Sequence, residues 1–189
     1  MNPLATLLAF LAVVALAAPA AAAPVPEDER VPLDLRRTTL VVADMERSLA
    51  FYRDALGMVV TYDHWIYTPR EAKSADEAEV ARRLVFLRAN DTYIGVLGLL
   101  EYTKPEREPV EIAERPFHPG TTVLVFNLED NRAAFARASK VEGAGVLWAP
   151  EEVTYPDYGG DGVLRVVTSG VHDPDGFAVE INQLLDAVD

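Results

Sequence analysis

Four residues have types and positions that could support acid–base or metal chemistry. Glu180 lies in a strand-like run that follows the turn Asp-Pro-Asp-Gly at residues 173–176, and the histidines are His64, His118 and His172. A carboxylate can act as a general base, and carboxylate and imidazole groups together bind divalent metals. No two of the histidines share the spacing of one helix face or one hairpin. We expect His118 in a solvated connector and His172 beside a turn, so a histidine-based metal site is the less favoured reading.

His64 stands in an aromatic segment that also contains Tyr62, Trp65 and Tyr67. Aromatic side chains that cluster can stack on a planar ligand. The same cluster could instead pack against an inserted segment of the protein. On the first interpretation, His64, Trp65 and Tyr67 are candidate ligand-binding residues.

Composition excludes several classes of function. The chain has no cysteine, which rules out disulfides, thiol nucleophiles and a lipidated cysteine. Its formal net charge is −13, and all the charged residues follow residue 26. Binding to a phosphate backbone requires clustered Lys and Arg, so a nucleic-acid partner is not expected. We expect a small-molecule ligand as the partner.

Two stretches of the chain follow one plan, and they must position the candidate residues. Residues 38–57 contain a β-rich run, Asp44 as a helix cap, an amphipathic helix and Gly57 as a stop. Residues 123–145 repeat this order, with Asp130 as the cap. More strand-like sequence follows each stretch. A duplicated strand–helix–strands unit makes two half-sites that can face one another across a cleft.

Hydrophobic periodicity assigns the elements of each unit. In the first unit we expect strands at residues 37–42, 58–62, 84–88 and 93–100, and a helix at residues 45–56. Ser74 and Glu77 form a capping-box pattern, which predicts a short inserted helix at residues 74–82. In the second unit we expect a helix after Asp130 that ends near residue 141, and strands at residues 123–128, from 146, at 163–168 and at 177–184.

Charge and hydropathy divide the chain into five segments. Residues 1–26 carry no charged side chain, and an uninterrupted apolar run leads into the small-residue stretch at residues 20–23. This pattern predicts a cleaved signal peptide and an exported protein, periplasmic in a two-membrane bacterium and otherwise secreted. An uncleaved anchor is the alternative. The predicted segments are a signal peptide at 1–23, a linker at 24–34, a first module at 35–102, a connector at 103–119 and a second module at 120–189.

The runs VVADMERSLAFYRDALGM and HDPDGFAVEINQ resemble the vicinal oxygen chelate superfamily. This superfamily contains glyoxalases, extradiol dioxygenases and the fosfomycin- and bleomycin-resistance proteins. The resemblance implies an α+β fold in which two βαβββ modules form a cup-shaped half-barrel, and a homodimer is plausible. In metal-dependent members the cup holds one divalent ion, typically bound by a His near the start of each module's first strand and a Glu on its last strand.

The four metal positions of the family fall on Arg37, Gly98, Val123 (or Thr122, if the alignment slips by one residue) and Glu180. Only Glu180 is a metal ligand, whereas a catalytic ion needs about three protein ligands. Arg37 would repel a cation. The resemblance therefore implies that no metal cofactor of the usual kind is bound, although a divalent metal with non-standard ligands remains an alternative. Arg37 either pairs with Glu180 or turns outward.

Strand alternation predicts the lining of the cup. The lining is apolar near Gly98 and Val123, with a few polar groups around it. Such a surface suits an organic ligand with a few anchoring contacts better than a hydrated ion. The predicted ligand-binding residues in the cup are Arg37, Thr39, Gly98, Asn127 and Asn182, with Glu180 as the candidate catalytic residue.

Three functions remain open. The first is an exported protein that binds a small organic ligand in the cup without a metal. The second is an enzyme: either a glyoxalase-like lyase or dioxygenase with a non-standard metal site around Glu180, or a metal-free catalyst that uses Glu180 as a base. The third is a structural role with the cup collapsed. The absence of the usual metal ligands favours the first.

Overall fold

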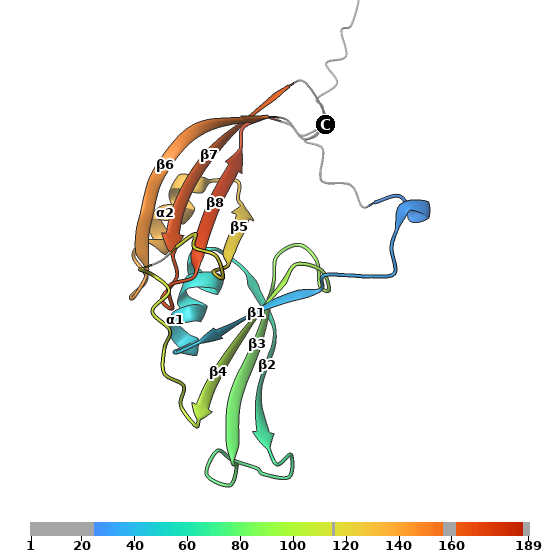
Figure 1. Ribbon diagram of the computed structural model, residues 1–189, viewed down its shortest axis with the longest axis vertical. Coiled ribbons are helices and arrows are strands. Elements are labelled where there is room, and N and C mark those ends of the chain that lie inside the picture. Colours follow the sequence, from blue (N-terminus) through green and yellow to red (C-terminus); the bar gives the residue numbers. More distant parts are fainter. Residues whose placement is uncertain (1–24, 115, 157–161, 187–189) are drawn as a thin grey trace, which may run out of the picture.

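The computed structural model describes residues 25–114, 116–156 and 162–186, and the predicted signal peptide lies outside this range. Within it, two four-stranded sheets lie end to end, as Figure 1 shows. No described helix is long and apolar enough to cross a membrane. A single 3₁₀ turn, η1 (Glu27–Glu29), precedes the first sheet.

Each module is built from one strand, one helical segment and three further strands. The first module contains β1 (Arg37–Val42), α1 (Met45–Leu49), η2 (Ala50–Ala55), β2 (Val59–Thr68), β3 (Val80–Arg88) and β4 (Val96–Lys104). The second contains β5 (Val123–Asn127), α2 (Asn131–Ala138), β6 (Gly145–Pro156), β7 (Val163–His172) and β8 (Ala178–Leu184). The strand orders are β1-β4-β3-β2 and β5-β8-β7-β6, and β1 and β5 pair in parallel with β4 and β8. The predicted pair of βαβββ modules is confirmed.

Aspartate caps start both helices, as predicted. Asp44 Oδ1 accepts a hydrogen bond of 3.0 Å from the Arg47 amide, and Asp130 Oδ1 accepts one of 3.0 Å from the Ala133 amide. The first helix is an α-helix up to Leu49 and a π-helix from Ala50 onward, which is η2. Within it, the Leu56 amide donates to the Phe51 carbonyl at 3.1 Å, five residues earlier. The expected continuous α-helix over residues 45–56 is therefore an α-helix followed by a π-helical turn.

The predicted inserted helix at residues 74–82 is wrong. Its capping contact forms, since the Glu77 amide donates to Ser74 Oγ at 3.4 Å. The chain makes only a turn there, and β3 begins at Val80, which pairs with Thr68. The cross-strand pairing outweighs the local helix signal, and β2 therefore extends well beyond its predicted end at residue 62.

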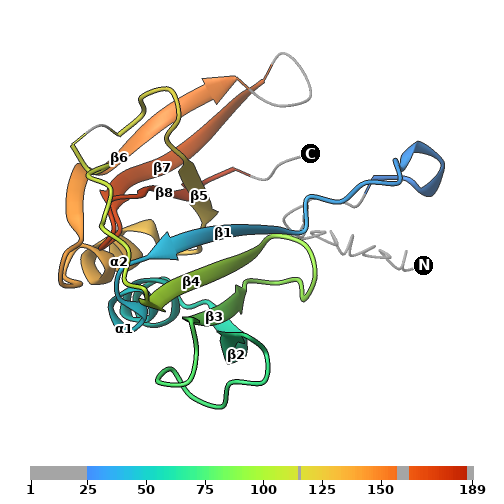
Figure 2. The ribbon, with the colours of Figure 1, turned by 60° about the horizontal axis from the view of Figure 1, so that its bottom comes forward.

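The helical segments of both modules share one hydrophobic core. Phe51 and Tyr52 of η2 are fully buried in a cluster that also contains Val179 and Ile181 of β8. Figure 2 shows the helices of the two modules next to one another. The Arg137 guanidinium of α2 donates to the Ala55 carbonyl of η2 at 2.9 Å, which joins the two modules directly. The helix-covered face of each sheet is thus occupied by packing, and the opposite face carries no helix.

A buried polar contact also locks the modules together. The hydroxyl of Tyr52 donates to Asp173 Oδ2 at 2.7 Å, and the amides of Asp175 and Phe177 donate to Asp173 Oδ1 at 3.0 and 2.9 Å. Burial raises the pKa of Asp173 to about 6, against the lowering effect of these hydrogen bonds. The pKa of Tyr52 is raised well above its usual value by burial and by the Asp173 charge.

Candidate functional site

Side-chain alternation defines the face of each sheet that has no helix on it, here called the helix-free face. On β1, Leu40 and Val42 are buried in the shared core, whereas Thr39 and Val41 are exposed on the other side. On β8, Val179 and Ile181 enter the core. The residues that alternate with them on β1, β4, β5 and β8 lie on the helix-free faces, as the sequence predicted: Arg37, Thr39, Val41, Gly98, Val123, Asn127, Ala178, Glu180 and Asn182.

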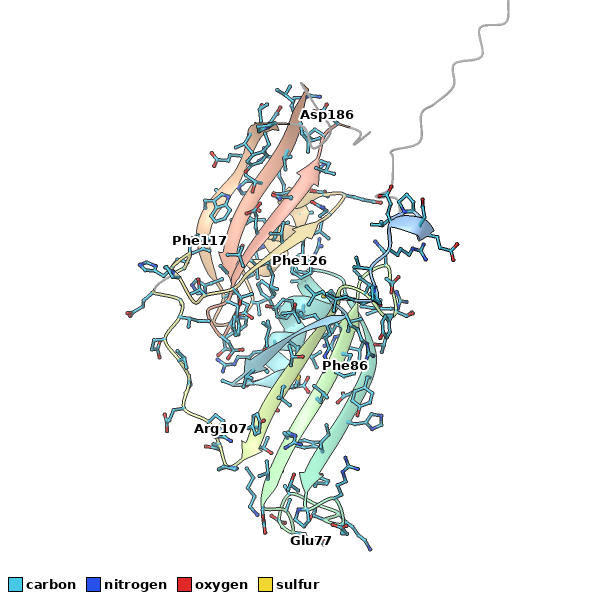
Figure 3. All side chains as sticks on the ribbon, turned by 45° about the vertical axis from the view of Figure 1, so that its right-hand side comes forward. Glu77, Phe86, Arg107, Phe117, Phe126 and Asp186 are labelled. Atoms are coloured by element: carbon cyan, nitrogen blue, oxygen red, sulfur yellow. The ribbon has the colours of Figure 1, made fainter. Side chains whose placement is uncertain are left out.

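A row of side chains crosses the helix-free face of the first module. Thr39 pairs in register with Gly98, Gly98 with Phe86, and Phe86 with Tyr62. The guanidinium carbon of Arg37 lies 4.2 Å from the centroid of the Phe86 ring, and Phe86 stacks on Tyr62 with 4.7 Å between centroids. Figure 3 shows the position of Phe86 on the first sheet. Gly98 makes this possible, since an added Cβ would lie 2.7 Å from Thr39 Oγ1 and 3.2 Å from Arg37 Cδ.

The aromatic segment of β2 is divided between the two faces of its sheet. The His64 ring meets Tyr62 edge-on, with 4.5 Å between centroids. Trp65 and Tyr67 stack with one another, 6.4 Å apart and 9° from parallel, on the opposite face. Successive strand residues point to opposite sides, so the expectation of one aromatic cluster is wrong. Only Tyr62 and His64 lie on the helix-free face.

The helix-free face of the second module carries the candidate catalytic carboxylate. Glu180 Oε1 accepts a hydrogen bond of 2.7 Å from Asn182 Nδ2. Asn182 Oδ1 and Thr168 Oγ1 are buried without a hydrogen-bond partner in the described chain. Beside Glu180, the Trp148 ring covers Gly170 so closely that a Cβ there would overlap it. Trp148 was not predicted as a residue of this face, because only the register of β6 against β7 places it there.

Strand register allows a direct test of the four metal positions. Arg37 is the first residue of β1, and Val123 is the first residue of β5. Two residues further along, Thr39 of β1 pairs with Gly98, and Val125 of β5 pairs with Glu180, so Gly98 and Glu180 occupy equivalent positions in the two modules. Of these four side chains, only Glu180 can donate a lone pair to a metal. Among the described residues, no group of three or more His, Asp or Glu side chains is arranged to hold a metal ion. The donor set does not fit a divalent metal.

Of the two alternatives for Arg37, pairing with Glu180 is not found among the ion pairs of the described chain. Arg37 packs on Phe86, and Glu180 bonds to Asn182. The outward alternative for Arg37 is wrong as well, because its side chain lies half-buried over Gly98.

The histidines remain apart from one another. His118 is exposed in the connector, 3.2 Å from the Pro116 carbonyl. His172 Nδ1 lies 3.1 Å from the Asp173 carbonyl oxygen, and its ring covers Gly145. His64 is on the first module's helix-free face. A site built from all three is therefore not formed.

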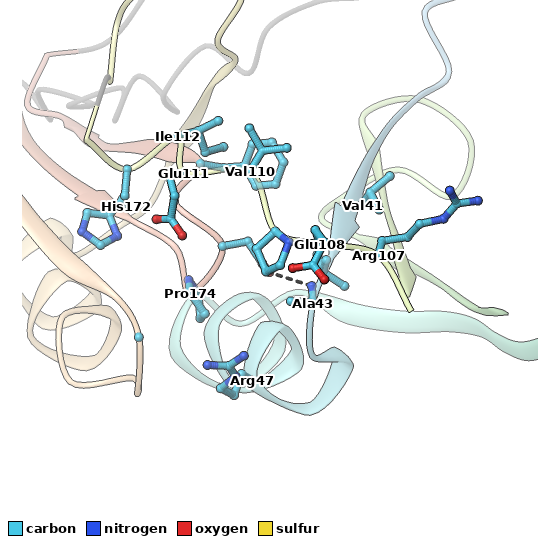
Figure 4. A pocket seen from close by; sticks show the side chains of 17 residues that line it. Val41, Ala43, Arg47, Arg107, Glu108, Val110, Glu111, Ile112, His172 and Pro174 are labelled. Carbon is cyan, nitrogen blue, oxygen red and sulfur yellow. Dashed lines mark hydrogen bonds between the residues drawn. The ribbon is translucent and has the colours of Figure 1, made fainter. Parts of the chain in front are cut away.

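A pocket of about 640 Å³ lies between the modules, and residues 107–113 of the connector line one side of it. In Figure 4, His172 and Glu111 lie at one end of it and Arg107 at the other. A smaller pocket of about 170 Å³ separates the first residues of β1 from β5 and includes Arg37. Neither pocket is lined by Glu180. The larger pocket has these lining residues: Val41, Val42, Ala43, Arg47, Arg107, Glu108, Pro109, Val110, Glu111, Ile112, Ala113, Gly143, His172, Pro174, Asp175, Gly176 and Phe177.

Comparisons with known proteins agree with this architecture. Residues 34–181 match the Glyoxalase/Bleomycin resistance protein/Dioxygenase superfamily. No curated protein sequence matches the chain. Among solved structures, a glyoxalase family protein from Bacillus cereus is similar with a TM-score of 0.58 and 14% identity, over 85% of this chain and 100% of that chain.

Two glyoxalase I structures are similar as well. A glyoxalase I variant from Zea mays has a TM-score of 0.53 and 20% identity, over 79% of this chain and 46% of that chain. The trypanothione-dependent glyoxalase I of Leishmania major has a TM-score of 0.50 and 21% identity, over 80% of this chain and 86% of that chain. At these identities the similarity concerns the fold alone.

Proposed function

Because the chain belongs to the Glyoxalase/Bleomycin resistance protein/Dioxygenase superfamily, we propose that it binds a small organic ligand on its helix-free faces without the divalent metal of metal-dependent relatives. One observation carries the proposal. Arg37 lies across Gly98 and onto the Phe86 ring, at the place where the resemblance puts two metal ligands. A permanently charged guanidinium replaces one ligand and its aliphatic stem covers the position of the other.

The surroundings of Arg37 suit an organic molecule. Phe86 and Tyr62 form a stacked aromatic surface beside it, and both rings are partly exposed. Binding sites for organic molecules combine apolar surface with a few polar groups that fix orientation. Thr39 and Arg37 supply such polar groups on the first module, and Asn127, Glu180 and Asn182 supply them on the second.

A ligand screen tests this function. The chain lacking residues 1–23 is exposed to a library of neutral, cationic and anionic aromatic and aliphatic fragments, and binding is followed by ligand-observed NMR. We expect fragments whose signals are lost in Tyr62→Leu. The matched control is Trp65→Leu, which removes an aromatic side chain from the same strand but from the opposite face. A library without any ligand, or ligands that depend on Trp65 and not on Tyr62, would contradict the proposal.

We also propose that the protein is exported and that it forms a homodimer. The charge-free, apolar N-terminal stretch supports export, and N-terminal sequencing of the protein recovered from its native host tests it. Exposed Val41 on the edge strand β1, and exposed Val123 and Val125 on the edge strand β5, support association between copies. Light scattering after gel filtration at several protein concentrations tests the dimer.

A further inference from the structure

The helix-free face of the first module is cationic, although the chain as a whole has a formal net charge of −13. Arg82 and Arg88 lie on β3 at even-numbered positions with Phe86, and therefore on the same side of the sheet as Arg37. The alternating positions of β3, such as Val85, enter the core. Three arginines thus occupy one face of a single four-stranded sheet.

The carboxylates of the same strands point the other way. Asp63 of β2 bonds to Arg83 on the helix-covered face, where Arg83 also reaches Glu46 of α1. Glu101 of β4 also lies on that face, because it pairs in register with Val42, which is buried in the core. The four strands consequently place no Asp or Glu on the helix-free face of the first module.

The arginines on this face have no acidic partner. In the described part of the chain, ion pairs within 4.0 Å involve Arg47, Arg53, Arg83 and Arg165. Arg37, Arg82 and Arg88 form none. Guanidinium groups that are partly buried and lack a counter-charge favour the binding of an anion, which supplies the missing charge-assisted hydrogen bonds. An anion that pairs with these arginines would come from outside the four strands, because the strands place no carboxylate on this face.

The aromatic rings specify the rest of the ligand. Phe86 and Tyr62 stack nearly parallel, 22° apart, in line with Arg37, and His64 meets Tyr62 edge-on two residues further along the same edge strand, β2. A guanidinium above a ring lies flat and keeps its N–H groups directed sideways, where a carboxylate or phosphate can bind in a bidentate manner. Phe86 lies between Arg37 and Tyr62, so a planar ligand would meet the edges of these rings.

The second module offers the opposite charge. Its helix-free face carries Glu180 and, from β6, Glu151, which pairs in register with Thr168. Its strands place no Arg or Lys on this face within the described residues, since Arg165 bonds to Asp186 and pairs with Thr154 away from it. An anion is therefore attracted to one half-site and repelled from the other.

We infer that the ligand of the first module's helix-free face is a planar aromatic anion. Its ring packs against the edges of the Tyr62 and Phe86 rings, and its carboxylate or phosphate binds Arg37, with Arg88 adding positive potential from two residues along β3. This inference rests on the proposed function and narrows it to one chemical class.

Matched ligand pairs test the inference. Calorimetric titration compares 2-naphthoate with 2-naphthamide, and 2-naphthyl phosphate with 2-naphthol, so that the ring is constant and only the charge changes. We expect each anion to bind at least tenfold more tightly than its neutral partner, and the preference to shrink as salt is raised. The two pairs distinguish a carboxylate ligand from a phosphate ligand.

Two variants at one position locate the effect. Arg37→Gln should abolish the preference for the anion, and Arg37→Lys should keep part of it because the charge remains while the planar stacking is lost. The control is Arg53→Gln, which removes an exposed arginine on η2 that pairs with Asp54, and which should leave the preference unchanged. Circular dichroism verifies that each variant is folded.

Several outcomes would overturn the inference. If the neutral members bind as tightly as the anions, or if the preference survives Arg37→Gln, the ligand class is wrong while ligand binding stands. If fragments bind elsewhere and no naphthyl compound binds, the class is wrong as well. Self-association that Arg37→Gln weakens, without any binding of anions, would assign the face to the acidic surface of a second copy. A protein that binds no compound of any kind contradicts the proposed function itself.

Discussion

The buried pair Tyr52–Asp173 makes a specific prediction about stability and pH. Asp173 is fully buried, and its pKa in the folded protein is raised to about 6 from an ordinary value of 3.8. A raised pKa means that the folded state holds the proton more tightly than the unfolded state. Protonation of Asp173 therefore contributes stability that is fully present below pH 3.8 and is lost as the pH rises through about 6.

Asp173→Asn removes this dependence. The amide keeps an oxygen for the amides of Asp175 and Phe177, which now donate at 3.0 and 2.9 Å, and its nitrogen can donate to Tyr52. The pKa of Asp173 shifts from 3.8 to about 6 on folding. By linkage, the free energy of unfolding of the wild type should therefore fall by roughly 1–2 kcal/mol, relative to that of the variant, between pH 5 and pH 8. The change should be complete above about pH 7.

Urea unfolding at half-unit steps from pH 5 to pH 8 measures the effect. The quantity to follow is the free energy of unfolding of the wild type minus that of Asp173→Asn. This difference should fall as the pH rises. The control for net charge is Asp28→Asn, which removes an exposed carboxylate in η1 and for which the same difference should stay nearly constant. A difference that is flat or that increases with pH would refute the reasoning about burial.

Three further predictions concern a helix cap, a packing contact and an ion pair. Asp44→Ala should lower the free energy of unfolding by about 1 kcal/mol, because the Arg47 amide loses its acceptor. Urea unfolding of the wild type and of this variant, in which the Asp130 cap is unchanged, measures the difference. Gly170→Ala should destabilise by roughly 1–3 kcal/mol and change the tryptophan emission spectrum, since the new Cβ overlaps the Trp148 ring; an unchanged spectrum would argue against that contact. Arg83→Met should lower stability by about 1 kcal/mol and return the depressed pKa of its partner carboxylate on β2 toward its ordinary value, which an NMR titration detects.

Local signals predicted the elements whose limits are set by side-chain alternation and by helix caps. The strand at 37–42 has the bounds predicted from its alternation, and both aspartate caps make the contacts that their positions predicted. The inserted helix at 74–82 failed because a long-range pairing with β2 outweighed a capping box that does form. A π-helical turn has no comparable sequence signal, so η2 was not predictable.

The site depends more on register than on local pattern. Alternation placed Arg37 and Glu180 on the faces where the structure has them. The same rule, applied to β2, separates His64 from Trp65, so that error was avoidable. Trp148 over Gly170 was not predictable, because two β-bulges in β6 set the pairing. The stacking of Arg37 on a β3 ring likewise follows only from the strand order.

The most direct test of the account is the metal content of the protein. The chain lacking residues 1–23, purified without a histidine tag, is incubated with Zn²⁺, Ni²⁺, Mn²⁺ or Fe²⁺, freed of excess metal and measured by mass spectrometry. We expect far less than one ion per chain, because Glu180 is alone among the four family positions in offering a ligand. One tightly held ion per chain that is lost in Glu180→Gln would contradict it.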